Sequence, residues 1–161
     1  NDPQLAQVKR IADAMVLAGQ PWATDTRAVD VGSGAGAPAV PWLLLDTRVA
    51  RCTLVEKSLK RRAFLNHAIG SLGLHTRAAV MASVDALAPG SRFDVATSRA
   101  TFAPAEWLKL GGKLAAQVVV FLSEETEREL DTSNHNARRV AYTLPFSNKA
   151  RTLLVARAPG A

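Results

Sequence analysis

The decisive stretch of this sequence is Arg27-Ala-Val-Asp-Val-Gly-Ser-Gly-Ala-Gly36. Its first half favours a β-strand, and its second half places glycines at alternate positions, Gly32, Gly34 and Gly36. Glycine permits positive φ and lets a ligand approach the backbone, and the first turn of a following helix offers free N–H groups. Ala37-Pro38 then leads into a new apolar segment. The stretch therefore predicts a strand, a tight loop and a helix start around a nucleotide-type ligand.

The glycine loop is compatible with more than one ligand class. Gly32-x-Gly34-x-x-Ala37 also satisfies the loose dinucleotide fingerprint of nicotinamide-dependent oxidoreductases. A glycine-rich turn without any ligand is a further interpretation, although three glycines in five residues cost chain entropy that a simple turn does not require. The loop alone does not identify its ligand.

Composition is that of a folded domain with a basic surface. The 161 residues fit one domain, and 48% are hydrophobic and 21% charged. No apolar run approaches the roughly 20 residues of a membrane span, and the first residues lack a signal-peptide pattern, so we expect a cytoplasmic protein with no membrane partner. A net charge of +6 favours a polyanionic partner such as RNA or DNA. Cys52 is the only cysteine and is expected in the core.

Alternating apolar segments predict an α/β fold for residues 1–161, treated as a single domain. Strands are expected at 27–31, 49–55, 76–82, 93–97 and 114–121, and helices at 38–45, 59–72, 104–110 and 124–130. The pair Gly111-Gly112 is expected to end the third of these helices. Residues 140–144 and 150–156 are joined by a link too short for a crossover helix, so they predict an antiparallel hairpin. The expected fold is a Rossmann-like doubly wound sheet, mostly parallel, with an N-terminal helix in residues 1–20 packed on it.

Ligands of such sheets bind at the carboxyl ends of the strands, near the point where the strand order reverses. Glu56 ends the second strand, where a carboxylate can accept hydrogen bonds from ribose hydroxyls. Asp85 follows the third strand, where a carboxylate can receive the exocyclic amine of an adenine. Each acid has a simpler interpretation as a charged residue at a helix start.

Three blocks carry a resemblance to a known family. They are Val29-Asp-Val-Gly-Ser-Gly-Ala-Gly36, Leu54-Val-Glu56 followed by Lys60-Arg-Arg-Ala-Phe-Leu65, and Phe93-Asp-Val-Ala-Thr-Ser-Arg-Ala100. With Arg10-Ile-Ala-Asp13, which is similar to a His-x-x-Asp block before the first strand, they resemble the bacterial small-subunit rRNA guanine-N7 methyltransferases. This is the glucose-inhibited division protein B family, RsmG/GidB. The Thr-Ser-Arg-Ala block is the most specific match.

The resemblance implies a class I methyltransferase fold, S-adenosyl-L-methionine as methyl donor, and N7 of a guanine in small-subunit (16S) rRNA as acceptor. The partner is then rRNA or the small ribosomal subunit, and a monomer is expected. Guanine N7 carries an accessible lone pair, so the transfer needs in-line positioning more than proton removal. The histidines show no metal-ligand spacing, so no metal is expected.

The resemblance also assigns individual residues. Those assigned to the cofactor are Asp30, Gly32, Ser33, Gly34, Gly36, Glu56, Ser83, Val84, Asp85 and Arg99. The loop residues cradle the methionine and ribose, Glu56 holds the ribose, and Asp85 with its neighbours meets the adenine. Arg99 is also expected to position the acceptor base or its phosphate, with a surface ion pair as the alternative. Those assigned to RNA are Lys57, Lys60, Arg61 and Arg62, for which a solvated helix face is an equal alternative.

The chain departs from the family pattern in places. Gln117-Val-Val-Val120 stands where the family has a Lys-Gly pair, and Ala82-Ser-Val-Asp85 stands where it has Gly-Arg-Ala-Glu. Ala37 replaces an aromatic residue, and the chain begins closer to the core than is typical. A diverged paralogue with another acceptor, or a non-catalytic RNA-binding relic, therefore stays open. An NAD(P)-dependent oxidoreductase is disfavoured by the terminal hairpin and the Thr-Ser-Arg-Ala block.

Overall fold

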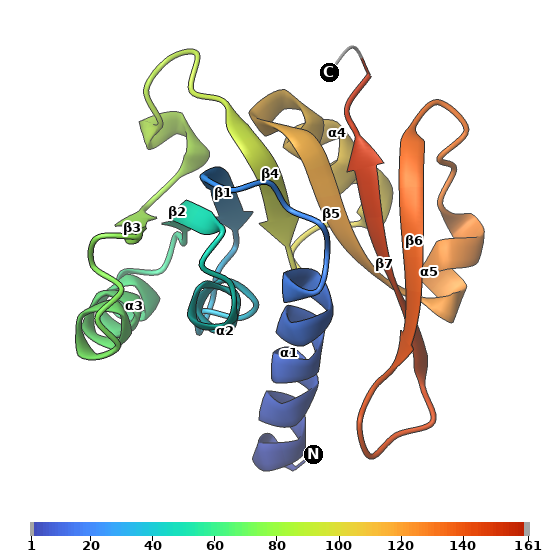
Figure 1. Ribbon diagram of the computed structural model, residues 1–161, viewed down its shortest axis with the longest axis horizontal. Helices are drawn as coiled ribbons and strands as arrows, with labels where there is room; N and C mark the ends of the chain where they lie inside the picture. Colours follow the sequence, from blue (N-terminus) through green and yellow to red (C-terminus); the bar gives the residue numbers. More distant parts are fainter. Residues whose placement is uncertain (1, 160–161) are drawn as a thin grey trace.

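A single sheet of seven strands forms the centre of the computed structural model, which describes residues 2–159. The strands lie in the order β3-β2-β1-β4-β5-β7-β6 (Figure 1). Their bounds are β1 Thr26–Val31, β2 Val49–Val55, β3 Ala78–Met81, β4 Phe93–Ser98, β5 Ala115–Ser123, β6 Asn136–Thr143 and β7 Ala150–Arg157. Strands β1 to β5 are parallel, and β7 runs antiparallel to β5 and β6. The predicted sheet with its reversed C-terminal hairpin is confirmed.

Helices cover both faces of the sheet. They are α1 Pro3–Ala18, α2 Ala39–Leu45, α3 Leu59–Ser71, α4 Pro104–Leu114 and α5 Glu124–Glu129, with a short 3-10 turn η1 at Val84–Ala86. The first three lie on one face, and α4 and α5 lie on the other (Figure 1). Leu17, Trp42 and Leu65 fill the core on the first face, and Trp107 and Leu108 fill it on the second. Leu17 thus brings α1 into the core on the first face.

Local hydrogen bonds explain where the helices begin. Asp2 caps α1 by accepting from the backbone N–H of Gln4, and Ser58 caps α3 by accepting from that of Arg61. Ser123 and Thr126 form a reciprocal capping box at the start of α5. Each cap satisfies an N–H that the first helical turn leaves without a partner.

Helix α4 corrects the sequence prediction, because Gly111 and Gly112 do not end it. The helix continues to Leu114. A Cβ atom on Gly111 would lie 2.7 Å from Cγ1 of Val118 in β5, so this glycine permits close contact between helix and sheet. The indole N–H of Trp107 donates to the Val119 carbonyl at 2.8 Å and fixes the same contact.

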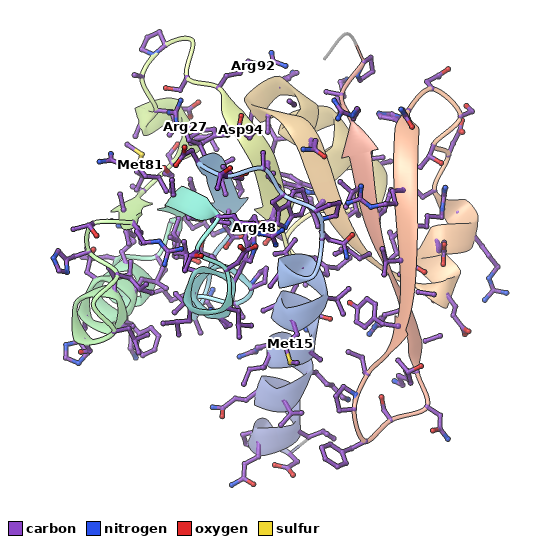
Figure 2. The ribbon with its side chains drawn as sticks, viewed as in Figure 1. Met15, Arg27, Arg48, Met81, Arg92 and Asp94 are labelled. Carbon is purple, nitrogen blue, oxygen red and sulfur yellow. The ribbon has the colours of Figure 1, made fainter. Side chains whose placement is uncertain are left out.

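The two ends of the sheet differ in character. At the amino ends of β1 and β4, Arg27 and Asp94 lie side by side (Figure 2), and the Arg27 backbone N–H donates to the Asp94 carboxylate at 2.7 Å. At the carboxyl ends, β1 and β4 are neighbours although β2 and β3 lie between them in the chain, so the strand order reverses there.

No helix within residues 2–159 is long and apolar enough to cross a membrane.

Candidate functional site

The glycine loop that follows β1 has three residues with positive φ, +77° at Gly32, +56° at Gly34 and +97° at Gly36. A Cβ atom on Gly32 would collide with the Thr101 side chain, and one on Gly36 would lie 2.8 Å from Cγ2 of Val40. At Gly34 the nearest atom to such a Cβ is the Gly32 carbonyl oxygen, at 4.0 Å. Two of the glycines thus permit packing, whereas Gly34 leaves open space above the loop.

Glu56 connects the glycine loop to the end of β2. Its side chain is buried, with Oε1 accepting from the Gly34 N–H at 3.1 Å and Oε2 accepting from the Ser58 N–H at 2.7 Å. The Arg61 guanidinium lies 3.8 Å from Oε1. A carboxylate oxygen can accept more than one hydrogen bond, so the held carboxylate keeps capacity for ligand hydroxyls.

Two adjoining cavities open over these residues. The larger, called the main cleft, has a volume of about 630 Å³ and is lined by Val31, Gly32, Val55, Glu56, Lys57, Arg61, Ala82, Ser83, Val84, Ala100, Thr101, Phe102 and Leu110. The smaller, called the loop cavity, has about 300 Å³ and is lined by Arg10, Gly32, Ser33, Gly34, Ala35, Ala37, Arg61, Arg99, Ala100 and Thr101. These volumes lie in the range of small-molecule sites. The fold thus brings the glycine loop, Glu56, Ser83 and Val84 to one place.

The main cleft has an apolar wall and a polar end. Val31, Val55 and Leu110 line it together with Phe102, whose ring stacks on Trp107 at a centroid distance of 5.6 Å and an interplanar angle of 10°. Glu56 supplies the carboxylate. An apolar slot beside a hydrogen-bonding carboxylate suits a nucleoside, because the base is flat and apolar on its faces and the ribose carries hydroxyls.

Around η1, the residues assigned to the adenine differ in whether they line the main cleft. Ser83 and Val84 line the main cleft, whereas Asp85 is exposed and its backbone N–H donates to Ser83 Oγ at 3.0 Å. A contact between the Asp85 side chain and an adenine amine stays a prediction.

Asp30 lies beneath the loop and is 1% exposed. Its Oδ1 accepts from the Thr97 hydroxyl at 2.7 Å, and the two residues are register partners in β1 and β4. Its Oδ2 has no hydrogen-bond partner within residues 2–159. Burial raises the pKa of Asp30 to about 6, against the opposing effect of the hydrogen bond from Thr97, while the Ser33 hydroxyl donates to the Asp30 backbone carbonyl at 3.0 Å. Its position supports the loop from below, and direct contact with a cofactor stays a prediction.

Arg99 forms the ion pair that was one of its two interpretations, and its role in positioning the acceptor stays a prediction. Its Nε donates to Oδ2 of Asp13 at 2.6 Å, forming an ion pair with α1. It also lines the loop cavity, beside Arg10. Ala100, which follows it, has a φ of +56° and lines both cavities.

The four basic residues assigned to RNA fall into different environments. Lys57 and Arg61 line the main cleft, and Lys60 is exposed on α3. Arg62 instead donates through Nη1 to the carbonyls of Glu56 and Lys57, at 3.0 and 2.7 Å. Arg62 therefore stabilises the turn between β2 and α3.

Several lining residues are absent from the sequence-based assignment. Among them are Arg10, Thr101, Phe102 and Leu110. Phe102 and Thr101 directly follow the Thr-Ser-Arg-Ala block, so the end of β4 was a usable signal. Within the described residues, no group of three or more His, Cys, Asp or Glu side chains is placed to hold a metal ion.

Comparison with solved structures defines the class of fold. The chain is similar to M. capricolum TrmK in complex with S-adenosyl-homocysteine, with a TM-score of 0.67 and 13% identity over 98% of this chain and 69% of that one. It is also similar to a SAM-dependent methyltransferase from Aquifex aeolicus, with a TM-score of 0.66 and 14% identity over 97% of this chain and 94% of that one. The fold is that of a class I methyltransferase.

Sequence comparison then gives the family. The family model for GidB, rRNA small subunit methyltransferase G, matches residues 2–152, and the chain belongs to this family. The Laribacter hongkongensis relative of that name is 36% identical over 68% of this chain and 56% of its own length. The Stenotrophomonas maltophilia relative is 33% identical over 70% of this chain and 52% of its own length. The chain thus spans about half the length of the curated relatives it matches.

Proposed function

We propose that this chain is an S-adenosylmethionine-dependent methyltransferase that modifies N7 of a guanine in small-subunit rRNA. Family membership supports the reaction class. The observation that carries the proposal is the pairing of Gly34 with Glu56, because the loop N–H holds the buried carboxylate while the missing Cβ leaves room above it.

The residues present fit the proposed cofactor. The apolar wall of the main cleft, with Ser83 and Val84, suits the adenine, and Glu56 suits the ribose hydroxyls. The backbone of the glycine loop, from Gly32 to Ala35, suits the methionine portion in the loop cavity. When bound there, the cofactor supplies an electrophilic methyl group on a sulfonium.

Arginines line the part of the site that would face the RNA acceptor. Arg10, Arg61 and Arg99 line the loop cavity, so the rim next to the proposed methyl group is cationic and suits a polyanion. Guanine N7 is nucleophilic without deprotonation, so these side chains need only bind and orient the RNA. An exocyclic base amine as acceptor would instead call for a proton acceptor near the cavity.

The test is transfer of tritium from labelled S-adenosylmethionine to unmethylated small-subunit rRNA, either as a transcript or assembled in subunits. We expect incorporation that appears as 7-methylguanosine after nuclease digestion. Incorporation of tritium into another nucleoside would show that guanine N7 is not the acceptor. Binding of both cofactor and RNA without transfer would identify a non-catalytic relic and contradict the proposal.

A further inference from the structure

A third cavity adjoins the loop cavity. It has a volume of about 180 Å³ and is lined by Asp13, Arg99, Ala100, Phe121, Leu122, Tyr142 and Arg151. Arg99 and Ala100 belong to both cavities, so the two share a wall. The third cavity is smaller than ordinary small-molecule sites but exceeds the volume of a few water molecules, so it has room for a group the size of a phosphate.

Hydrogen bonds in this cavity hold Arg99 from one side only. Asp13, which is 4% exposed, accepts from Arg99 Nε at 2.6 Å and from the Tyr142 hydroxyl at 2.6 Å. Both carboxylate oxygens are therefore engaged. The two terminal nitrogens of Arg99 have no hydrogen-bond partner within residues 2–159 and remain available to a ligand.

Arg151 provides a second cation in the same cavity. It is the direct register partner of Tyr142 across β6 and β7 and is half-buried. Its guanidinium makes no ion pair or hydrogen bond within the described part of the chain. Asp13 balances the charge of Arg99, so Arg151 leaves the cavity with a net positive charge.

We propose that this cavity is a phosphodiester subsite, in which Arg99 and Arg151 bind a backbone phosphate of the acceptor strand next to the target base. Arginine donors suit phosphate oxygens, and such contacts set the position of a nucleic acid without reading its sequence. Asp13 and Tyr142 are positioning residues, since they fix Arg99 through Nε. The inference rests on the proposed function for the identity of the strand.

The first experiment compares two arginines of β7. Arg151→Gln removes the unpaired cation of the cavity, and Arg157→Gln removes an exposed cation from the other end of the same strand. Filter binding with unmethylated small-subunit rRNA, over a series of salt concentrations, measures both variants. We expect Arg151→Gln to weaken binding about tenfold and to lower the salt slope by about 0.7 to 0.9, the value for one phosphate contact. Equal effects of the two variants would overturn the subsite.

The second experiment tests the positioning role of Tyr142 with a substitution that is itself neutral in charge. Tyr142→Phe removes one hydrogen bond to Asp13. We expect it to weaken RNA binding several-fold in the native background and to have no further effect in an Arg99→Gln background, because the tyrosine acts through that arginine. Additive effects would contradict a positioning role.

Two further readouts separate failure of this inference from failure of the proposed function. Binding of S-adenosylhomocysteine should be unchanged in Arg151→Gln, since Arg151 lines neither the main cleft nor the loop cavity. Loss of that binding would count against a subsite confined to RNA. Absence of methyl transfer by the native protein would refute the enzyme, whereas the salt slopes report on the phosphate subsite independently of turnover.

Discussion

Gly34 and Glu56 show how single residues combine packing and ligand space in this site. The hydrogen bond from Gly34 to Glu56 joins the loop after β1 to the end of β2, at 3.1 Å. Because the backbone N–H makes this hydrogen bond, no side chain is needed at position 34, and the space that a side chain would fill stays open. Gly34 therefore leaves space for the ligand, whereas Gly32 and Gly36 permit close packing within the fold.

Gly34→Ala is expected to fold yet lose cofactor affinity. The new Cβ meets open space in the free protein but occupies the loop cavity. The positive φ costs about 1 to 2 kcal/mol of folding stability. Gly73→Ala is the matched control, since Gly73 has a φ of +69° and open space at the far end of α3. Calorimetry with S-adenosylhomocysteine should show about a tenfold or larger loss for the first variant only. Equal affinities would contradict this role of Gly34.

The raised pKa of Asp30 leads us to expect that folding stability depends on pH. Its folded pKa of about 6 lies above the ordinary value of 3.8, so between these pH values the folded chain binds more protons than the unfolded chain. The contribution of protonated Asp30 to the free energy of unfolding is complete below the unfolded pKa of 3.8. It is lost as pH rises through the folded pKa of about 6. By neutral pH the loss amounts to about 3 kcal/mol.

The variant Asp30→Asn tests this linkage. Asparagine keeps an Oδ1 acceptor for the Thr97 hydroxyl and cannot ionise. In urea unfolding between about pH 5 and pH 8, the variant should lose less free energy of unfolding with rising pH than the native protein does. Identical pH profiles would show that Asp30 is not the responsible group.

At the scale of elements, α4 shows how a helix and a strand set each other's boundaries. Gly111 lies where α4 contacts β5, and Trp107 donates to the Val119 carbonyl in the same contact. Leu110, one residue earlier, lines the main cleft. The packing of α4 therefore also shapes the apolar wall of the candidate site.

Gly111→Ala is expected to lower the free energy of unfolding by about 1 to 3 kcal/mol, because the added methyl would lie 2.7 Å from Val118. Gly70→Ala in α3 is the control, since no atom lies within 4 Å of its added Cβ. Alanine has the higher helix propensity, so this variant should gain up to about 1 kcal/mol. Urea unfolding measures both. A Gly111→Ala variant as stable as the native protein would show that the contact is not tight.

Local patterns predicted the elements better than their ends. Apolar runs located every strand. The end of α4 was missed, because a glycine pair reads locally as a stop, whereas here the contact with Val118 decides. Predicting that end requires knowing which strand the helix packs against.

At the scale of the whole molecule, the site collects residues that are distant in the sequence. Parallel-sheet topology made the meeting of the glycine loop with Glu56 predictable, since β1 and β2 end at the same edge. The contact between Asp13 and Tyr142 joins residues 129 positions apart, from α1 and β6, and no local pattern announces it. Helix α1 also places Arg10 in the lining of the loop cavity.

The most direct test of the account is calorimetric titration of the native chain with S-adenosylhomocysteine and, separately, with NADH. The two ligands share an adenosine and differ in what the loop cavity must accept. We expect saturable binding of S-adenosylhomocysteine at one site and no binding of NADH. Preferential binding of NADH, or binding of neither ligand, would contradict the claim that the glycine loop and Glu56 form a methyl-donor site.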